Sequence, residues 1–179
     1  MRFTDFLKAT VMTCAAAATA LAAITVAAAS GDDDPRLVSF AAGWWLVAAL
    51  IGGLLGRRGQ TTPPIARLLA NARSTPALPE VHPSRVLLNR LWPLLLCTIV
   101  AAGLALLFPQ VPAIATGFAI IWALSWRRQD AAVTAIEGRD GVRYYVERTS
   151  PLQPIQLVRT PGFKSRAWEL EEARAPAPP

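Results

Sequence analysis

The uncharged stretch from Leu91 to Trp126 constrains the fold of this chain more than any other feature. It contains no Asp, Glu, Lys or Arg. A helix needs about 20 apolar residues to cross the roughly 30 Å hydrocarbon core of a bilayer, so the stretch is long enough for two crossings. Pro109 and Pro112 interrupt the hydrogen bonding that one continuous helix would need. The stretch therefore predicts a transmembrane hairpin, with helices over about 85–108 and 112–128.

The composition agrees with a membrane protein. Hydrophobic residues make up 53% of the 179 residues, against roughly 45–50% in soluble domains. The formal net charge is +6, and the basic residues lie between and after the apolar stretches, not in a patch interleaved with aromatic side chains. We therefore relate the charge to membrane topology and expect no nucleic-acid partner.

The first apolar run predicts a transmembrane helix over about 9–30. It follows a short basic start, and Ala27-Ala28-Ala29 would satisfy the small-residue rule for signal-peptide cleavage. The run is longer than the roughly 7–15 apolar residues of a signal peptide, so we favour an uncleaved helix. A cleaved signal peptide is the alternative.

A second crossing is predicted over about 37–56, a length of roughly 30 Å as a helix. Three aspartates precede it, at positions 32 to 34. We interpret them as a solvated loop in which Asp34 caps the next helix, not as a metal site. The two cysteines, Cys14 and Cys97, form no CxxC pair and are interpreted as packing thiols.

Small residues at four-residue spacing predict close helix packing, because they let helix backbones approach each other in lipid. On the second and fourth helices they are Ala48, Gly52, Gly56, Ala113 and Gly117. On the first helix the matching small residues are Ala16, Ala20, Ala23 and Ala27. We expect the first two helices to pair within one chain, with homodimerisation as the alternative.

The loop between the two hairpins contains an amphipathic segment over about 64–73. One helical face is apolar, and it consists of Ile65, Leu68, Leu69 and Ala72. Arg67 and Arg73 lie toward the other side. A helix of this length is only marginally stable in water. We therefore expect it to lie on the membrane surface or against a partner.

After residue 128 the composition becomes typical of a small β-rich tail. Residues 132–147 predict a β-hairpin with an Asp-Gly turn, and 154–160 predicts a third, edge strand. The last residues are expected to be disordered. One face of the second strand is apolar, formed by Val142, Tyr144 and Val146. This face needs a cover, which is either the third strand alone or a docking surface such as lipid, the central-loop helix or a partner strand.

No nucleotide-binding, hydrolase or metal-enzyme motif occurs in the sequence, and no cofactor is predicted. The membrane interior of the predicted helices contains hydroxyl groups, such as those of Thr98 and Thr116, but no carboxylate, histidine or basic residue. Coupled transporters usually place ionisable groups inside the membrane, so a coupled transporter is disfavoured.

We therefore predict an all-α membrane protein with four transmembrane helices in residues 1–128 and a small β-rich tail in residues 129–179. All basic residues except Arg36 would lie on one side, which predicts that both termini are cytoplasmic. Arg, Ala and Pro are abundant, as in a G+C-rich bacterial genome, so we expect the bacterial inner (plasma) membrane.

The predicted function is that of a non-enzymatic scaffold or accessory subunit that acts through its tail. The alternative is an oligomeric pore or passive carrier lined by hydroxyl groups. The expected partners are a bilayer with anionic headgroups and a membrane protein or a second copy of the chain. The predicted contact residues are Arg67, Arg73, Arg127, Arg128, Arg143, Tyr144 and Tyr145.

Overall fold

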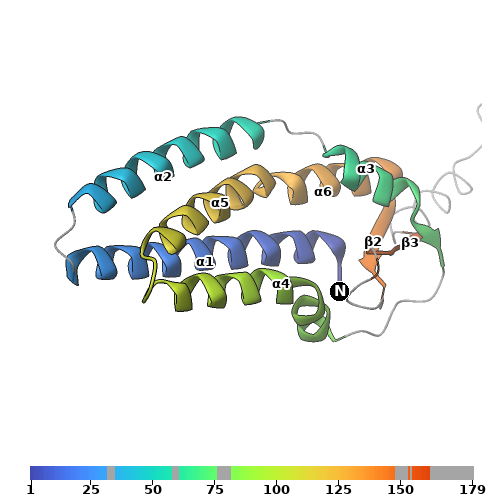
Figure 1. Cartoon of the computed structure of the whole chain (residues 1–179). Helices are drawn as coiled ribbons and strands as arrows, with labels where there is room; N and C mark the ends of the chain where they lie inside the picture. Colours follow the sequence, from blue (N-terminus) through green and yellow to red (C-terminus); the bar gives the residue numbers. More distant parts are fainter. Residues whose placement is uncertain (32–34, 58–60, 76–81, 148–152, 154, 162–179) are drawn as a thin grey trace, which may run out of the picture.

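The computed structural model describes all residues except 32–34, 58–60, 76–81, 148–152, 154 and 162–179. It is mostly helical, with a small three-stranded sheet at one end, as predicted (Figure 1). The helices are α1 (Phe3–Gly31), α2 (Pro35–Leu55), α3 (Pro63–Ala70), α4 (Pro83–Leu104), α5 (Gln110–Trp126) and α6 (Gln129–Asp140). The strands are β1 (Arg73–Ser74), β2 (Val142–Val146) and β3 (Leu157–Pro161).

Three of the described helices, α1, α2 and α4, are long and apolar enough to cross a membrane. This is consistent with the membrane protein predicted from the sequence. The fourth predicted span, α5, has 17 residues, which is about 26 Å of helix and so less than the hydrocarbon thickness. The fourth crossing therefore remains a prediction.

The central element of the helix bundle is α5, which packs against α1, α2 and α4. Its buried residues are mostly small, and they are Pro112, Ala113, Thr116, Gly117, Ala119 and Ala123. The prediction that the first two helices pair with each other is wrong for the main contact of α2, because α2 packs chiefly on α5 and only slightly on α1. On α1 the predicted small residues, Ala16, Ala20, Ala23 and Ala27, are exposed. In an alanine-rich helix small residues occur on every face, so their spacing does not identify the buried one.

The contact between α2 and α5 depends on two glycines, Gly52 of α2 and Gly56, which directly follows α2. A Cβ atom on Gly52 would lie 2.9 Å from the Leu124 Cβ and 3.0 Å from the Ile121 Cα. A Cβ atom on Gly56 would overlap the Leu124 carbonyl oxygen. Ala48, one turn earlier, is fully buried. The absence of side chains at these positions lets the two backbones touch.

Two tryptophans of α2 hold the other end of the same contact. The indole Nε1 of Trp44 donates a hydrogen bond to the Ile114 carbonyl oxygen at 3.1 Å, and that of Trp45 donates to the Ala113 carbonyl oxygen at 2.9 Å. The Trp44 ring lies over Gly117, where a Cβ atom would overlap it. An indole N–H in an apolar medium needs such an acceptor, so these bonds fix how α2 lies along α5.

The sheet has the order β1-β3-β2, with β3 parallel to β1 and antiparallel to β2. It joins the loop between the two helical hairpins to the tail. Its other edge meets the start of the chain, because Arg2 bridges Tyr145 and the Val146 amide donates to the Met1 carbonyl oxygen at 3.1 Å. The third strand was predicted over 154–160, close to the observed β3.

The predicted strand over residues 132–137 is wrong, because these residues belong to α6. Their alanines are strong helix formers, and the buried Val133 and Glu137 are four residues apart, as on one helix face. The Asp-Gly signal marks a chain reversal of another kind. Gly141 has a φ of 63° and ends α6 as a left-handed C-cap, after which β2 begins.

A hydrophobic core lies beside the sheet, at one end of the long helices. It combines residues from the start, middle and end of the chain, namely Phe3, Phe6, Leu7, Ile65, Leu69, Val86, Val133, Tyr144, Val146 and Leu157. We call the unit around this core the cap. It comprises the first two turns of α1, then α3, the start of α4, α6 and the sheet (Figure 1).

The cap decides between the two covers predicted for the apolar face of the tail. The self-contained meander is wrong and the cover by the central-loop helix is observed, because this face packs against Ile65 and Leu69 of α3 and also against Phe3, Phe6 and Leu7 of α1. The amphipathic segment does not rest on lipid with its apolar face, since Ile65 is 2% exposed and Leu69 is 7% exposed within the cap. It also ends at Ala70, three residues earlier than predicted, and Arg73 is in β1. The first helix begins at Phe3, because its early aromatic residues are part of this core.

Candidate functional site

The cap is the candidate functional site, because it gathers the basic residues of the chain. The long helices alternate in direction, so the start of α1, the end of α2, the start of α4 and the end of α5 all lie at the cap (Figure 1). Among the described Lys and Arg residues, only Arg36 belongs to the opposite end, where α2 begins. The cap end of the bundle is therefore strongly cationic.

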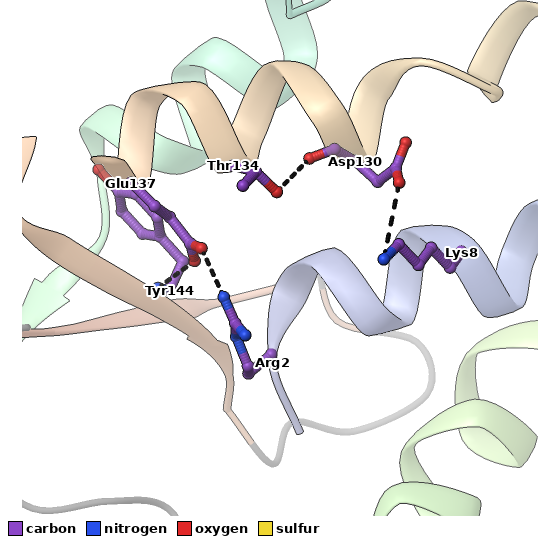
Figure 2. Close-up of polar contacts among 6 residues, drawn as sticks. All are labelled: Arg2, Lys8, Asp130, Thr134, Glu137 and Tyr144. Atoms are coloured by element: carbon purple, nitrogen blue, oxygen red, sulfur yellow. Dashed lines mark hydrogen bonds and ion pairs between the residues drawn. The ribbon is translucent and has the colours of Figure 1, made fainter. Parts of the chain in front are cut away.

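A buried carboxylate joins three elements of the cap (Figure 2). Glu137 of α6 is 6% exposed. Its Oε2 accepts a hydrogen bond from the Arg2 Nη2 at 2.9 Å, and its Oε1 accepts one from the Tyr144 amide at 2.9 Å. Both carboxylate oxygens are thus engaged, one with a positive charge and one with a strand amide. Glu137 holds the start of the chain and β2 against α6.

Further polar contacts position the neighbouring segments. Gln129, at the start of α6 and 3% exposed, accepts a hydrogen bond from the Thr62 amide at 3.2 Å, just before α3 begins. Lys8 lies 4.0 Å from the Asp130 carboxylate, and its side chain is 63% exposed (Figure 2). So open an ion pair contributes little to stability. The hydrogen bonds of Gln129 and Glu137 therefore set the arrangement of the cap.

The predicted contact residues divide into exposed and buried groups. The five arginines are exposed and Tyr145 is half-buried, the arginines being Arg67, Arg73, Arg127, Arg128 and Arg143. Tyr144 is only 5% exposed and belongs to the core of the cap. Burial raises the pKa of the Tyr144 phenol, and the nearby Asp140 carboxylate adds to this effect. Tyr144 is therefore a packing residue that no partner can reach.

The sheet brings together residues that are distant in the sequence. In the strand register Arg73 is opposite Val158, and Val158 is opposite Tyr145. Arg143 lies two residues before Tyr145, on the same face of β2. Arg73, Arg143 and Tyr145 thus share one sheet face. The sequence does not reveal this, because β1 has only two residues and no strand pattern of its own.

Sequence reasoning also missed the roles of Arg2 and Glu137. The signal that could have found Glu137 is its spacing, because it falls on the same face as Val133 once the segment is treated as a helix. The partner Arg2 carries no comparable signal. It meets Glu137 only because α1 begins at the cap and not in the membrane.

An apolar cavity of about 520 Å³ lies between α1, α4 and α5. Its lining residues are Thr10, Cys14, Leu21, Leu91, Pro93, Leu94, Cys97, Thr98, Ala115, Phe118, Ala119 and Trp122. The Thr10 hydroxyl donates to the Phe6 carbonyl oxygen at 2.9 Å, and the Thr98 hydroxyl donates to the Leu94 carbonyl oxygen at 2.8 Å. Both hydroxyls are therefore satisfied by their own helices, and the cavity offers mainly apolar surface.

The alternative of a hydroxyl-lined pore gains no support within one chain. Thr116 is 1% exposed, and its hydroxyl donates to the Pro112 carbonyl oxygen at 2.8 Å. Thr25 is equally buried, and its hydroxyl donates to the Leu21 carbonyl oxygen at 2.8 Å. These groups are enclosed between helices and already bonded, so they present no polar path to water.

In the part of the chain that the structure describes, no group of three His, Cys, Asp or Glu residues is placed to hold a metal ion. Comparison of the chain with protein-family models, curated proteins and solved structures finds no match.

Proposed function

We propose that this protein is a four-span protein of the bacterial inner membrane that acts as a non-enzymatic scaffold or accessory subunit. Its contact surface would be the cap. The observation that carries the proposal is the shared core of the cap, which draws on Phe3, Ile65 and Val146, from the start, middle and end of the chain. A cationic unit that shares one core and is joined to a helix bundle suits binding to an acidic partner.

The shared core supports four crossings through a simple parity argument. The start of α1, the whole of α3 and the start of α4 lie in one unit, so α1 and α2 together cross and return. The end of α4 lies at the opposite end of the bundle, and α6 is again part of the cap. If α4 crosses the membrane, α5 has to bring the chain back. The helix α5 is a few Å shorter than the hydrocarbon core, and local thinning of the bilayer accommodates a mismatch of this size.

The charge distribution supports an orientation with the cap in the cytoplasm. Basic residues in short flanking loops remain on the cytoplasmic side. The cap end carries every described Lys and Arg except Arg36. Both termini would then be cytoplasmic. The start of α1 is part of the core, so cleavage after Ala29 would remove Phe3, Phe6 and Leu7 from it. This favours an uncleaved first helix.

Reporter fusions test this topology. A reporter that is active only outside the cytoplasm should be active after Gly31 and after Phe108, and inactive at the C-terminus. A reporter that fluoresces only in the cytoplasm should give the reverse pattern. The pair after Phe108 and at the C-terminus isolates α5, because a crossing helix reverses the signal. Equal signals at these two sites would refute the fourth crossing.

The exposed arginines of the cap suggest a partner with an acidic surface. Arg67 is on α3, and Arg73 and Arg143 are on the sheet, so all three project from the cap and not from the bundle. A positive patch steers and orients acidic partners more than it adds raw affinity. The expected partner is an acidic membrane or cytoplasmic protein, bound beside anionic headgroups.

Affinity purification from membranes in mild detergent tests the scaffold function. Deletion of residues 129–179 is a poor test, because it also removes Val133, Val146 and Leu157 from the shared core. The double variant Arg67→Glu and Arg143→Glu changes only exposed charges. We expect that a partner protein co-purifies in fixed proportion with the wild type and with the control Arg36→Glu. The same partner should be missing from the purified double variant. Identical profiles for the three proteins would contradict a role of the cap in binding.

A further inference from the structure

The cavity between α1, α4 and α5 runs along the helices and begins at their cap ends. Thr10, Leu91 and Trp122 line it near the cap, and Leu21 and Ala115 line it deeper in the bundle. At about 1.5 Å per residue, the lined segment is about 16 Å long on α1 and about 10 Å long on α5. Half of the hydrocarbon core is about 15 Å. The lining therefore has about the length of one leaflet along α1, and about two thirds of that length along α4 and α5.

The lining suits a hydrocarbon chain. The threonine hydroxyls are already bonded to their own helices, and the remaining lining groups are aliphatic, aromatic or thiol. A volume of about 520 Å³ is within the range of pockets that hold small molecules, roughly 300–1,000 Å³. The helix on one side, α4, is loosely packed, because only 11% of the residues in its most apolar stretch are buried. The cavity can therefore be reached from the lipid.

Each of the three lining helices carries a cation near its cap end, outside the lining itself. Arg90 directly precedes the lining residue Leu91 and donates a hydrogen bond to the Gln153 carbonyl oxygen, Lys8 of α1 is paired with Asp130, and the exposed Arg127 follows the end of α5. No such group is found at the deep end, where the described lining residues are uncharged. Basic sites between transmembrane helices at the cytoplasmic surface bind anionic lipid headgroups.

We propose that this cavity binds one phospholipid with an anionic headgroup from the leaflet at the cap, with an acyl chain between α1, α4 and α5. The phosphate lies among the cap-end cations of these helices. The inference rests on the proposed placement of the helices in a membrane. The lipid fills a space that the side chains of the bundle leave open, and it ties the loosely packed α4 to α1 and α5.

Native mass spectrometry of the delipidated full-length protein in detergent tests the proposal. The probes are phosphatidylglycerol and phosphatidylcholine with the same acyl chains. We expect one phosphatidylglycerol to bind at least tenfold more tightly than phosphatidylcholine. In the double variant Ala115→Leu and Ala119→Leu, which fills the cavity, that binding should be lost. The matched control Ala16→Leu and Ala20→Leu adds the same groups to the exposed face of α1 and should bind as the wild type does.

The headgroup contribution is tested separately. Arg127→Gln should weaken phosphatidylglycerol binding about fivefold, because one cation near an anionic surface is worth about 1 kcal/mol. Arg36→Gln at the opposite end should leave it unchanged. Equal binding of both lipids by the wild type, or unchanged binding in the cavity-filled variant, would overturn the proposal.

A second measurement keeps the test valid if the filled variant folds poorly. Cys14 lines the cavity and is buried. In a Cys97→Ser background, phosphatidylglycerol should slow maleimide labelling of Cys14 in the otherwise unchanged protein, and phosphatidylcholine should not. Equal labelling rates with both lipids would refute the site. The reporter fusions do not depend on lipid binding, so failure of the lipid site and failure of the topology are distinguishable.

Discussion

Replacement of Glu137 by alanine should destabilise the cap by about 2–4 kcal/mol, because it leaves the Tyr144 amide and the Arg2 guanidinium without their acceptor. We expect the loss of stability to be smaller than the largest losses caused by removing one partner of a buried ion pair, since the Arg2 side chain is 39% exposed and can rehydrate. Amide exchange across β2, measured on the full protein in detergent, should show lost protection. The long helices should keep theirs.

Two variants serve as controls for this prediction. Glu137→Gln keeps an acceptor for the Tyr144 amide but loses the charge, so it should fall between alanine and the wild type. Asp130→Asn removes only the open ion pair with Lys8, which we expect to matter by no more than about 1 kcal/mol. If Glu137→Ala and Asp130→Asn were equally mild, Glu137 would not hold the cap together.

The second large effect is expected at Gly56. Alanine there would overlap the Leu124 carbonyl oxygen, which is backbone and cannot rotate away. The helices α2 and α5 would have to separate, at a cost of about 1–3 kcal/mol for an overpacked contact. The thermal stability of the detergent-solubilised protein should fall accordingly. Gly52→Ala meets the Leu124 Cβ and the Ile121 backbone and should act in the same direction.

Gly53 provides a matched control on the same helix. A Cβ atom there would meet nothing within 4 Å. Since alanine is the better helix former, Gly53→Ala should be neutral or stabilising, by up to about 1 kcal/mol. If all three glycine variants melted at the same temperature, close approach of α2 and α5 would not contribute to stability.

The sequence predicts the long helices well because their signal is local. An apolar segment bounded by Pro and charged residues needs no knowledge of its neighbours, and α2 and α4 begin within two residues of the predicted positions. The sequence does not predict which helices pack against each other. Small residues on α1 occur on all sides, and only the assembled bundle shows that Cys14, Leu21 and Thr25 face inward while Ala16 does not.

The cap could not be predicted from local patterns because its contacts join distant segments. The alternation around Val133 resembles a strand, but tertiary packing against α1 and β2 favours the helix there. The two-residue β1 exists only because β3 lies beside it. Of the candidate site, the exposed arginines were found from charge alone. Glu137 and Arg2 were missed, since their pairing depends on where α1 begins.

The contact between Met1 and Val146 has a consequence for biosynthesis. Because synthesis runs from the N-terminus, Met1 and Phe3 find their partners only after β2 and β3 have been made, since the Met1 carbonyl accepts the Val146 amide and Phe3 packs in the same core as Leu157. Until then Phe3, Phe6 and Leu7 are exposed apolar side chains, of the kind that chaperones and proteases recognise in incomplete proteins. The cap can therefore close only after the segment that contains β2 and β3 has been synthesised.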